Sequence, residues 1–252
     1  TPIQAFNASL IILCALTAYH GLEVVGRMIQ FVFPLFMVTF LAIILLVIPE
    51  MEFCNLLPIL AEGVLPVFKG SSTTAAFRGE VFLLLWLLPH VNRPEESRPY
   101  AFLAVILLGI ILSADTMASL MVFGTDLAGK LTFPTFVLAR YVAVGEFLER
   151  VEALVMVIWV AGVIVKVSVF FTVIVSSVRG CFGFKGSRWV VVVPVGIILY
   201  TGSLYIFQND PQVIQFMEKT WPPLAVVFQL VVPTILLAIA WLRGVKGGKE
   251  GA

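Results

Sequence analysis

Long runs of apolar residues constrain this chain more than any other feature of its sequence. Seven such runs occur, at 3–19, 29–48, 74–89, 100–123, 151–177, 189–207 and 222–242. A bilayer core of about 30 Å takes roughly 20 apolar residues in a helix. The runs are continuous and lack the alternation of apolar and polar residues that a membrane barrel needs. We therefore expect an all-α integral membrane protein with seven transmembrane helices, because a helix satisfies its own backbone groups in lipid.

The composition agrees with a lipid environment. Apolar residues make up 60% and charged residues 12% of the 252 residues, and the mean hydropathy is +1.06. Soluble domains average about 45–50% apolar and 25% charged residues. The net charge of +1 gives no reason to expect a nucleic acid partner. Cys14, Cys54 and Cys181 lie far apart without Cys-x-x-Cys spacing, so neither a disulfide framework nor a metal site is indicated.

The basic residues orient the expected spans. If the C-terminus is inside and the spans alternate, more Lys and Arg fall in the inside loops than in the outside loops, as the positive-inside rule requires. The chain begins at Thr1-Pro2, without Met or a charged leader, which predicts a fragment of a longer protein. We expect a single membrane domain, residues 1–252, that follows an odd number of missing N-terminal spans.

The third expected span, at 74–89, differs from the others. It is short, follows a Gly-Ser-Ser-Thr-Thr segment, and carries Arg78, Gly79 and Glu80 near its start. Charge and glycine at this depth favour a broken helix of the kind that transporters use. The alternative is an ordinary helix that begins at the membrane interface. In the first case Glu80 binds an ammonium group or accepts a proton, and in the second it pairs with Arg78.

Two more ionisable residues lie inside expected spans, where insertion of a charge costs about 2.5–3.5 kcal/mol. Lys166 is near the middle of 151–177, with Gly162 and Trp159 one and two turns away on roughly the same face. It either faces a cavity as a cation or proton carrier, or pairs with an acceptor that holds helices together. Asp115, in 100–123, either joins a polar pathway or packs with Ser and Thr partners, and we favour the packing role.

No catalytic signature accompanies these residues. HExxH, GxSxG, GxGD and P-loop motifs are absent, and the two histidines lie in unrelated places. We therefore expect no enzymatic activity, no cofactor and no metal site.

Several segments resemble one family when they are taken in order. They are Gly21-Leu22-Glu23-Val24-Val25-Gly26-Arg27 followed by Phe33-Pro34, then Asn55-Leu56-Leu57-Pro58, then Gly79-Glu80 with Leu87-Leu88-Pro89, and last the run 145–154 followed by Trp159 and Lys166-Val167-Ser168. Together they resemble the endospore germination permeases, the B subunits of nutrient germinant receptors. That family belongs to the amino acid–polyamine–organocation superfamily.

The resemblance implies a fold and a site. The superfamily has ten or more helices in two inverted five-helix repeats, a LeuT-like transporter fold, so the chain would hold helices four to ten and lack the first three. The broken sixth helix and the eighth helix would then line a ligand pocket. Its implied residues are Phe77, Gly79, Glu80, Trp159, Gly162 and Lys166. Arg78 departs from the mostly apolar pattern of the family at the break.

The resemblance also implies a function. The chain would bind a small germinant, such as the amino acid alanine, in the spore inner membrane and signal to other receptor subunits. The alternative is a proton-coupled amino acid permease in which Glu80 or Lys166 couples the proton. A third possibility is a structural membrane subunit without a ligand site.

Overall fold

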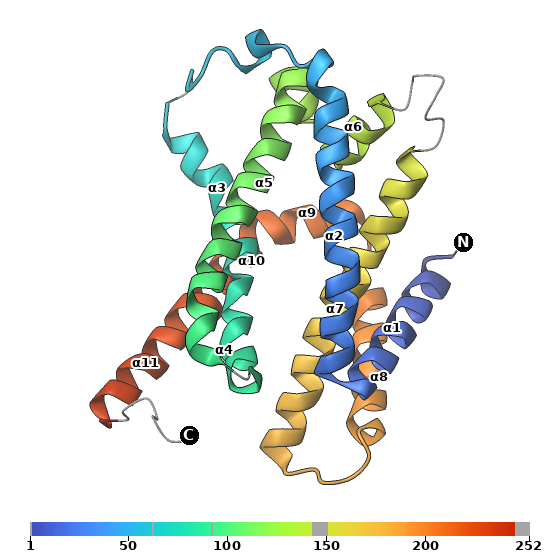
Figure 1. Cartoon of the computed structure of the whole chain (residues 1–252), viewed down its shortest axis with the longest axis vertical. Helices are drawn as coiled ribbons and strands as arrows, with labels where there is room; N and C mark the ends of the chain where they lie inside the picture. Colours follow the sequence, from blue (N-terminus) through green and yellow to red (C-terminus); the bar gives the residue numbers. More distant parts are fainter. Residues whose placement is uncertain (1, 62, 92, 143–150, 245–252) are drawn as a thin grey trace. The chain divides into compact units, whose positions relative to one another are not determined.

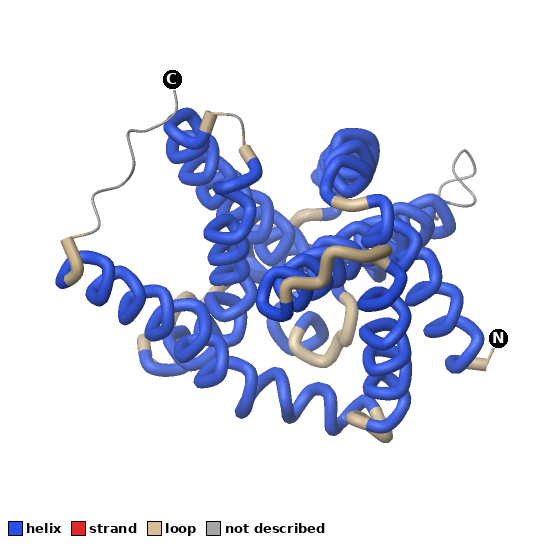
Figure 2. The backbone as a smooth tube through the Cα atoms, turned by 90° about the horizontal axis from the view of Figure 1, so that it is seen from below, coloured by secondary structure: helices blue, strands red, loops and turns tan. Residues whose placement is uncertain are grey.

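The computed structural model describes residues 2–61, 63–91, 93–142 and 151–244. These residues form helices joined by loops and turns, with no strand among them (Figure 2). Five described helices are long and apolar enough to cross a membrane. They are Ile3–His20, Leu22–Glu50, Pro99–Ala128, Ala153–Phe182 and Asp210–Leu242. The all-α prediction is confirmed, and the count of seven spans stays a prediction.

The chain divides into two compact units. Unit 1 consists of Thr1–Ile59 and Ile110–Ile206, and unit 2 consists of Leu60–Gly109 and Phe207–Ala252. The boundary at Gly109 falls inside one long helix, α5 (Pro94–Ala128). The expectation of a single membrane domain stays a prediction.

Unit 1 is built around α7 (Val151–Phe182). Four helices pack against it: α1 (Ile3–His20), α2 (Leu22–Val47), α6 (Pro134–Val142) and α8 (Trp189–Tyr205) (Figure 1). One buried apolar cluster joins α1, α7 and α8 and contains Cys14, Ala18, Phe171, Val175, Val191 and Val192. A second cluster joins α2, α5, α6 and α7 and contains Ile43, Val47, Ala118, Leu138, Ala139 and Val155.

A tight turn at Gly21 connects α1 directly to α2. Gly21 has φ 94° and ψ −169°, a conformation that only glycine adopts readily. An Arg188 Nη1–H donates to the Tyr19 carbonyl over 3.0 Å, which secures the end of α1. Because the turn takes a single residue, α2 begins at Leu22 rather than at the expected residue 29. Its first two turns contain the exposed ion pair of Glu23 and Arg27, 2.6 Å apart.

A second glycine interrupts α5 near its end. Gly124 has φ 69°, so the regular helix stops there and resumes in a new direction. The Met121 carbonyl accepts two hydrogen bonds from the loop after α2, from Asn55 Nδ2 at 2.7 Å and from the Glu52 backbone N–H at 3.2 Å. Carbonyls at a helix end need partners from outside the helix. The loop therefore caps this part of α5.

Unit 2 contains the expected third span, which the structure divides. An α-helix, α3 (Leu65–Arg78), passes into the 3₁₀ turn η3 (Gly79–Leu83), then α4 (Leu84–Leu87) and the 3₁₀ turn η4 (Leu88–His90). The helix begins before residue 74, and at Gly79 it changes pitch without unwinding. This segment is not among the five candidate spans. The structure therefore places a change of helix type at the expected break.

The C-terminal helix of unit 2 widens twice. In order it contains α9 (Asp210–Gln215), the π turn η5 (Phe216–Thr220), α10 (Trp221–Val226), the π turn η6 (Val227–Val231) and α11 (Val232–Leu242). Each π turn ends two residues before a proline, Pro222 or Pro233. Proline has no N–H and its ring clashes with the carbonyl four residues earlier, so the preceding turn widens.

Candidate functional site

The six residues implied by the resemblance fall into two groups, one in each unit. Phe77, Gly79 and Glu80 lie in unit 2, where α3 passes into η3. The other three, Trp159, Gly162 and Lys166, lie along α7 in unit 1. Each group shares one stretch of helix. A pocket formed by both groups stays a prediction.

The unit 2 group packs against the C-terminal helix. The Phe77 and Trp221 rings are in contact, with centroids 5.8 Å apart and planes at 36°. Gly79 lies against the Gln229 side chain, whose amide occupies the space that a side chain at Gly79 would need. Gly79 therefore allows η3 to approach η6, and its place in the sequence has a packing reason.

Replacing Gly79 with alanine should displace the Gln229 amide and destabilise the protein by about 1 kcal/mol, the lower end of the range for overpacking, because a flexible side chain can move aside. Unfolding by SDS in mixed micelles, followed by circular dichroism, measures the change. Gly162→Ala is the matched control, since nothing lies within 4 Å of the added methyl group there. Gln229→Ala in the same chain should restore most of the loss. Equal stability of Gly79→Ala and Gly162→Ala would contradict the packing role.

The unit 1 group is spread along α7. Trp159 is half-buried and meets the Phe133 ring edge to face, with centroids 6.3 Å apart. Gly162 has open space where a side chain would be. Lys166 lies on an exposed face of α7 in this unit. Of the three, Trp159 alone is among the residues that line the pocket described next.

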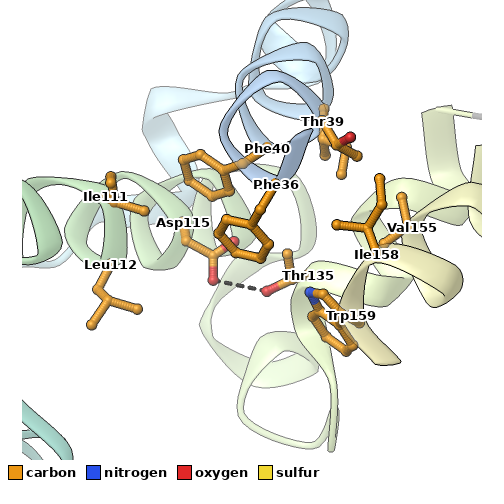
Figure 3. A pocket seen from close by; sticks show the side chains of 11 residues that line it. Phe36, Thr39, Phe40, Ile111, Leu112, Asp115, Thr135, Val155, Ile158 and Trp159 are labelled. Atoms are coloured by element: carbon orange, nitrogen blue, oxygen red, sulfur yellow. Dashed lines mark hydrogen bonds between the residues drawn. The ribbon is translucent and has the colours of Figure 1, made fainter. Parts of the chain in front are cut away.

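Trp159 borders a pocket of about 200 Å³ within unit 1 (Figure 3). Four helices form its wall: α7 itself and α2, α5 and α6. The lining residues are Phe36, Thr39, Phe40 and Ile43 of α2, Ile111, Leu112 and Asp115 of α5, Thr135 of α6, and Val155, Ile158 and Trp159 of α7. Asp115 is the one ionisable residue in this described lining. The pocket is an apolar space with a single acidic group.

Only one of the two Asp115 carboxylate oxygens accepts a hydrogen bond from a described residue. The Thr135 hydroxyl donates to Asp115 Oδ2 over 2.8 Å (Figure 3). The other oxygen, Oδ1, is buried and has no hydrogen-bond partner among the described residues. The favoured packing role therefore accounts for one oxygen. The donor comes from α6, twenty residues along the chain, and the neighbouring Thr116 donates instead to the Leu112 carbonyl within α5.

Apart from Trp159, the residues that line this pocket were not part of the site implied by the resemblance. The available signal was an acidic residue near the middle of an apolar span, which is costly unless it has a use. A buried oxygen without a donor, inside a cavity, can accept from a ligand N–H or hold a proton itself. No group of three or more His, Cys, Asp or Glu that would hold a metal occurs in the described part of the chain.

Long apolar helices, interrupted where glycine and proline demand it, define a helical membrane protein. A family model described as spore germination protein matches residues 1–211. The chain belongs to this spore germination permease family.

Two relatives show how far the similarity extends. The chain is 26% identical over 263 residues to spore germination protein KB of Bacillus subtilis (strain 168), covering 100% of this chain and 69% of the relative. It is 23% identical over 242 residues to spore germination protein XB of Bacillus anthracis, covering 96% of this chain and 67% of the relative. The chain has no significant match among the solved structures.

Proposed function

We propose that this chain is the membrane subunit of a spore nutrient germinant receptor. It binds a small germinant, an amino acid such as alanine, and signals to other receptor subunits in the spore inner membrane. Its seven spans correspond to helices four to ten of a LeuT-like inverted-repeat fold. A receptor requires only that binding favours one of two states of the helical bundle. The proposal includes no enzymatic step.

The family match over residues 1–211 carries this proposal. The change from α-helix to 3₁₀ helix at Gly79 supports it, because it falls at the position of the expected break, and transporters of this kind build their substrate sites at interrupted helices. In this proposal the residues that contribute to the germinant pocket are Phe77, Gly79, Glu80, Trp159, Gly162 and Lys166.

A proton-coupled amino acid permease is the second candidate. The observation that favours it is the Asp115 carboxylate, which lies in a candidate span and has one buried oxygen without a partner among the described residues. Acidic groups in such positions carry protons in many transporters. In this version Glu80 or Lys166 couples the proton, Asp115 joins the polar pathway that the proton follows, and the site opens to both sides of the membrane.

The test uses the full-length protein in proteoliposomes with labelled alanine, counting bound and lumenal label separately. Saturable binding without lumenal accumulation is expected for the receptor. Accumulation that follows a proton gradient would instead identify a permease, and Lys166→Ala should then abolish uptake while Lys185→Ala, a change in a loop, should not. If Lys166→Ala instead loses complex assembly without any dependence on ligand, the chain is a structural subunit, and both the receptor and the permease proposals are overturned.

A further inference from the structure

We propose that the pocket around Asp115 is a binding site for a small organic ammonium ion that carries no carboxylate. All residues of the pocket belong to unit 1, so the inference needs nothing from unit 2. It goes beyond the proposed function: the two sites share Trp159, but the germinant site also includes the residues near Gly79, whereas this site is complete without them.

The charge of Asp115 favours a cationic ligand. Asp115 lies within the candidate span Pro99–Ala128 and makes no ion pair with a described residue. Its Oδ2 accepts from Thr135, whereas Oδ1 is buried and has no donor in the described part of the chain. Ionised carboxylates in such surroundings need a counter-charge that also donates hydrogen bonds. An ammonium group supplies both, since each of its N–H groups is a donor.

Three aromatic rings form part of the pocket wall. Phe36 and Phe40 come from α2 with nearly parallel rings, 7° apart in orientation and 6.5 Å between centroids. Trp159 comes from α7, and Figure 3 shows the three rings bordering the space into which Asp115 projects. Aromatic faces attract cations, and Trp does so most strongly. A carboxylate next to aromatic rings in an apolar space therefore favours an organic cation over a hydrated metal ion, which would need many oxygen ligands.

The lining of the pocket disfavours a ligand that carries a carboxylate. Among its eleven described lining residues, none is basic. A zwitterionic amino acid would bring its own carboxylate into the apolar space beside Asp115 without a cation to meet it. Like charges in such a space repel, and the buried carboxylate would remain unpaired. The pocket therefore distinguishes an amine from the amino acid that has the same carbon skeleton.

Three probes of matched shape test this inference on the full-length protein in nanodiscs by isothermal titration. Isobutylammonium is the amine, valine is the same skeleton with a carboxylate, and isobutanol is the neutral analogue. Isobutylammonium should bind saturably and at least tenfold more tightly than either of the others. Absence of saturable isobutylammonium binding, or equal binding of valine, overturns the proposal. Alanine is not used as a probe here, so the outcome of this test does not depend on whether alanine binds to the receptor.

Substitutions then locate the site. Asp115→Asn keeps an acceptor for the Thr135 hydroxyl but removes the charge, and should weaken isobutylammonium binding at least tenfold. Asp126→Asn, an exposed position on the same helix, should leave binding unchanged. If Asp115→Asn fails to fold by circular dichroism, Trp159→Leu decides the matter with an expected weakening of about three- to tenfold, while Trp159→Phe retains most of the affinity. Unchanged binding in either the folded Asp115→Asn or the Trp159→Leu protein overturns the assignment.

Discussion

Replacing Phe171 with alanine should lower the free energy of unfolding by about 3 kcal/mol, the low end of the range for buried Phe→Ala changes. Phe171 is 0% exposed at the centre of the cluster that joins α1, α7 and α8. The tip of its ring, Cζ, lies 3.6 Å from the position where a side chain at Gly196 would begin. The low end applies because helices in a bilayer are held by close packing, with little contribution from water exclusion.

The measurement is SDS unfolding in mixed micelles, compared with Phe182→Ala. Phe182 lies at the end of the same helix and is 73% exposed. Its replacement should change the free energy of unfolding by less than about 0.5 kcal/mol, as is usual for exposed positions. If the two variants unfold at the same SDS fraction, Phe171 does not occupy the core described here.

Gly21→Ala should destabilise the protein by about 2–3 kcal/mol for two reasons that act together. A residue with a side chain is strained at φ 94° and ψ −169°, at a cost of about 1–3 kcal/mol. The new methyl group would also meet the Arg188 guanidinium, which must move away from the Tyr19 carbonyl. The turn between α1 and α2 would then lose both its conformation and its anchor.

Gly26→Ala is the matched control for this prediction. Gly26 lies within α2, and nothing is found within 4 Å of an added methyl group. Alanine favours a helix over glycine, so this variant should be as stable as the native protein or slightly more stable. A double-mutant cycle with Arg188→Ala separates backbone strain from displacement of the guanidinium. Equal unfolding of Gly21→Ala and Gly26→Ala would contradict the turn geometry.

The apolar runs predicted that the helices exist more accurately than they predicted where each helix begins and ends. Residues 3–19 became Ile3–His20 almost unchanged, because Gly21 ends the helix in the sequence as in the structure. Residues 29–48 became Leu22–Val47 because the charged residues Glu23 and Arg27 interrupt the apolar run, although the helix continues through them. Residues 222–242 became the end of a longer helix from Asp210, since proline widens that helix locally without ending it.

The site was harder to predict than the helices. Charge and glycine near the start of the expected third span single out Gly79, but its contact with Gln229 joins residues far apart in the chain, and no periodicity reports it. A charge at Asp115 is costly to insert in an apolar span, and the sequence predicts a Ser or Thr partner for it without identifying which one. The donor Thr135 lies beyond the Gly124 kink, on α6, so only the folded chain brings the two together.

The order of segments in unit 1 has a consequence for how the chain is made. Its first part, Thr1–Ile59, is separated from its second part, Ile110–Ile206, by residues that belong to unit 2. Tyr19 and its anchor Arg188 are 169 positions apart. A ribosome delivers α1 and α2 before α7 and α8, and these two helices stay in the membrane without them while residues 60–109 and the start of the second part are synthesised. A nascent chain that stops before α8 therefore lacks the core around Phe171 as well as its last helices.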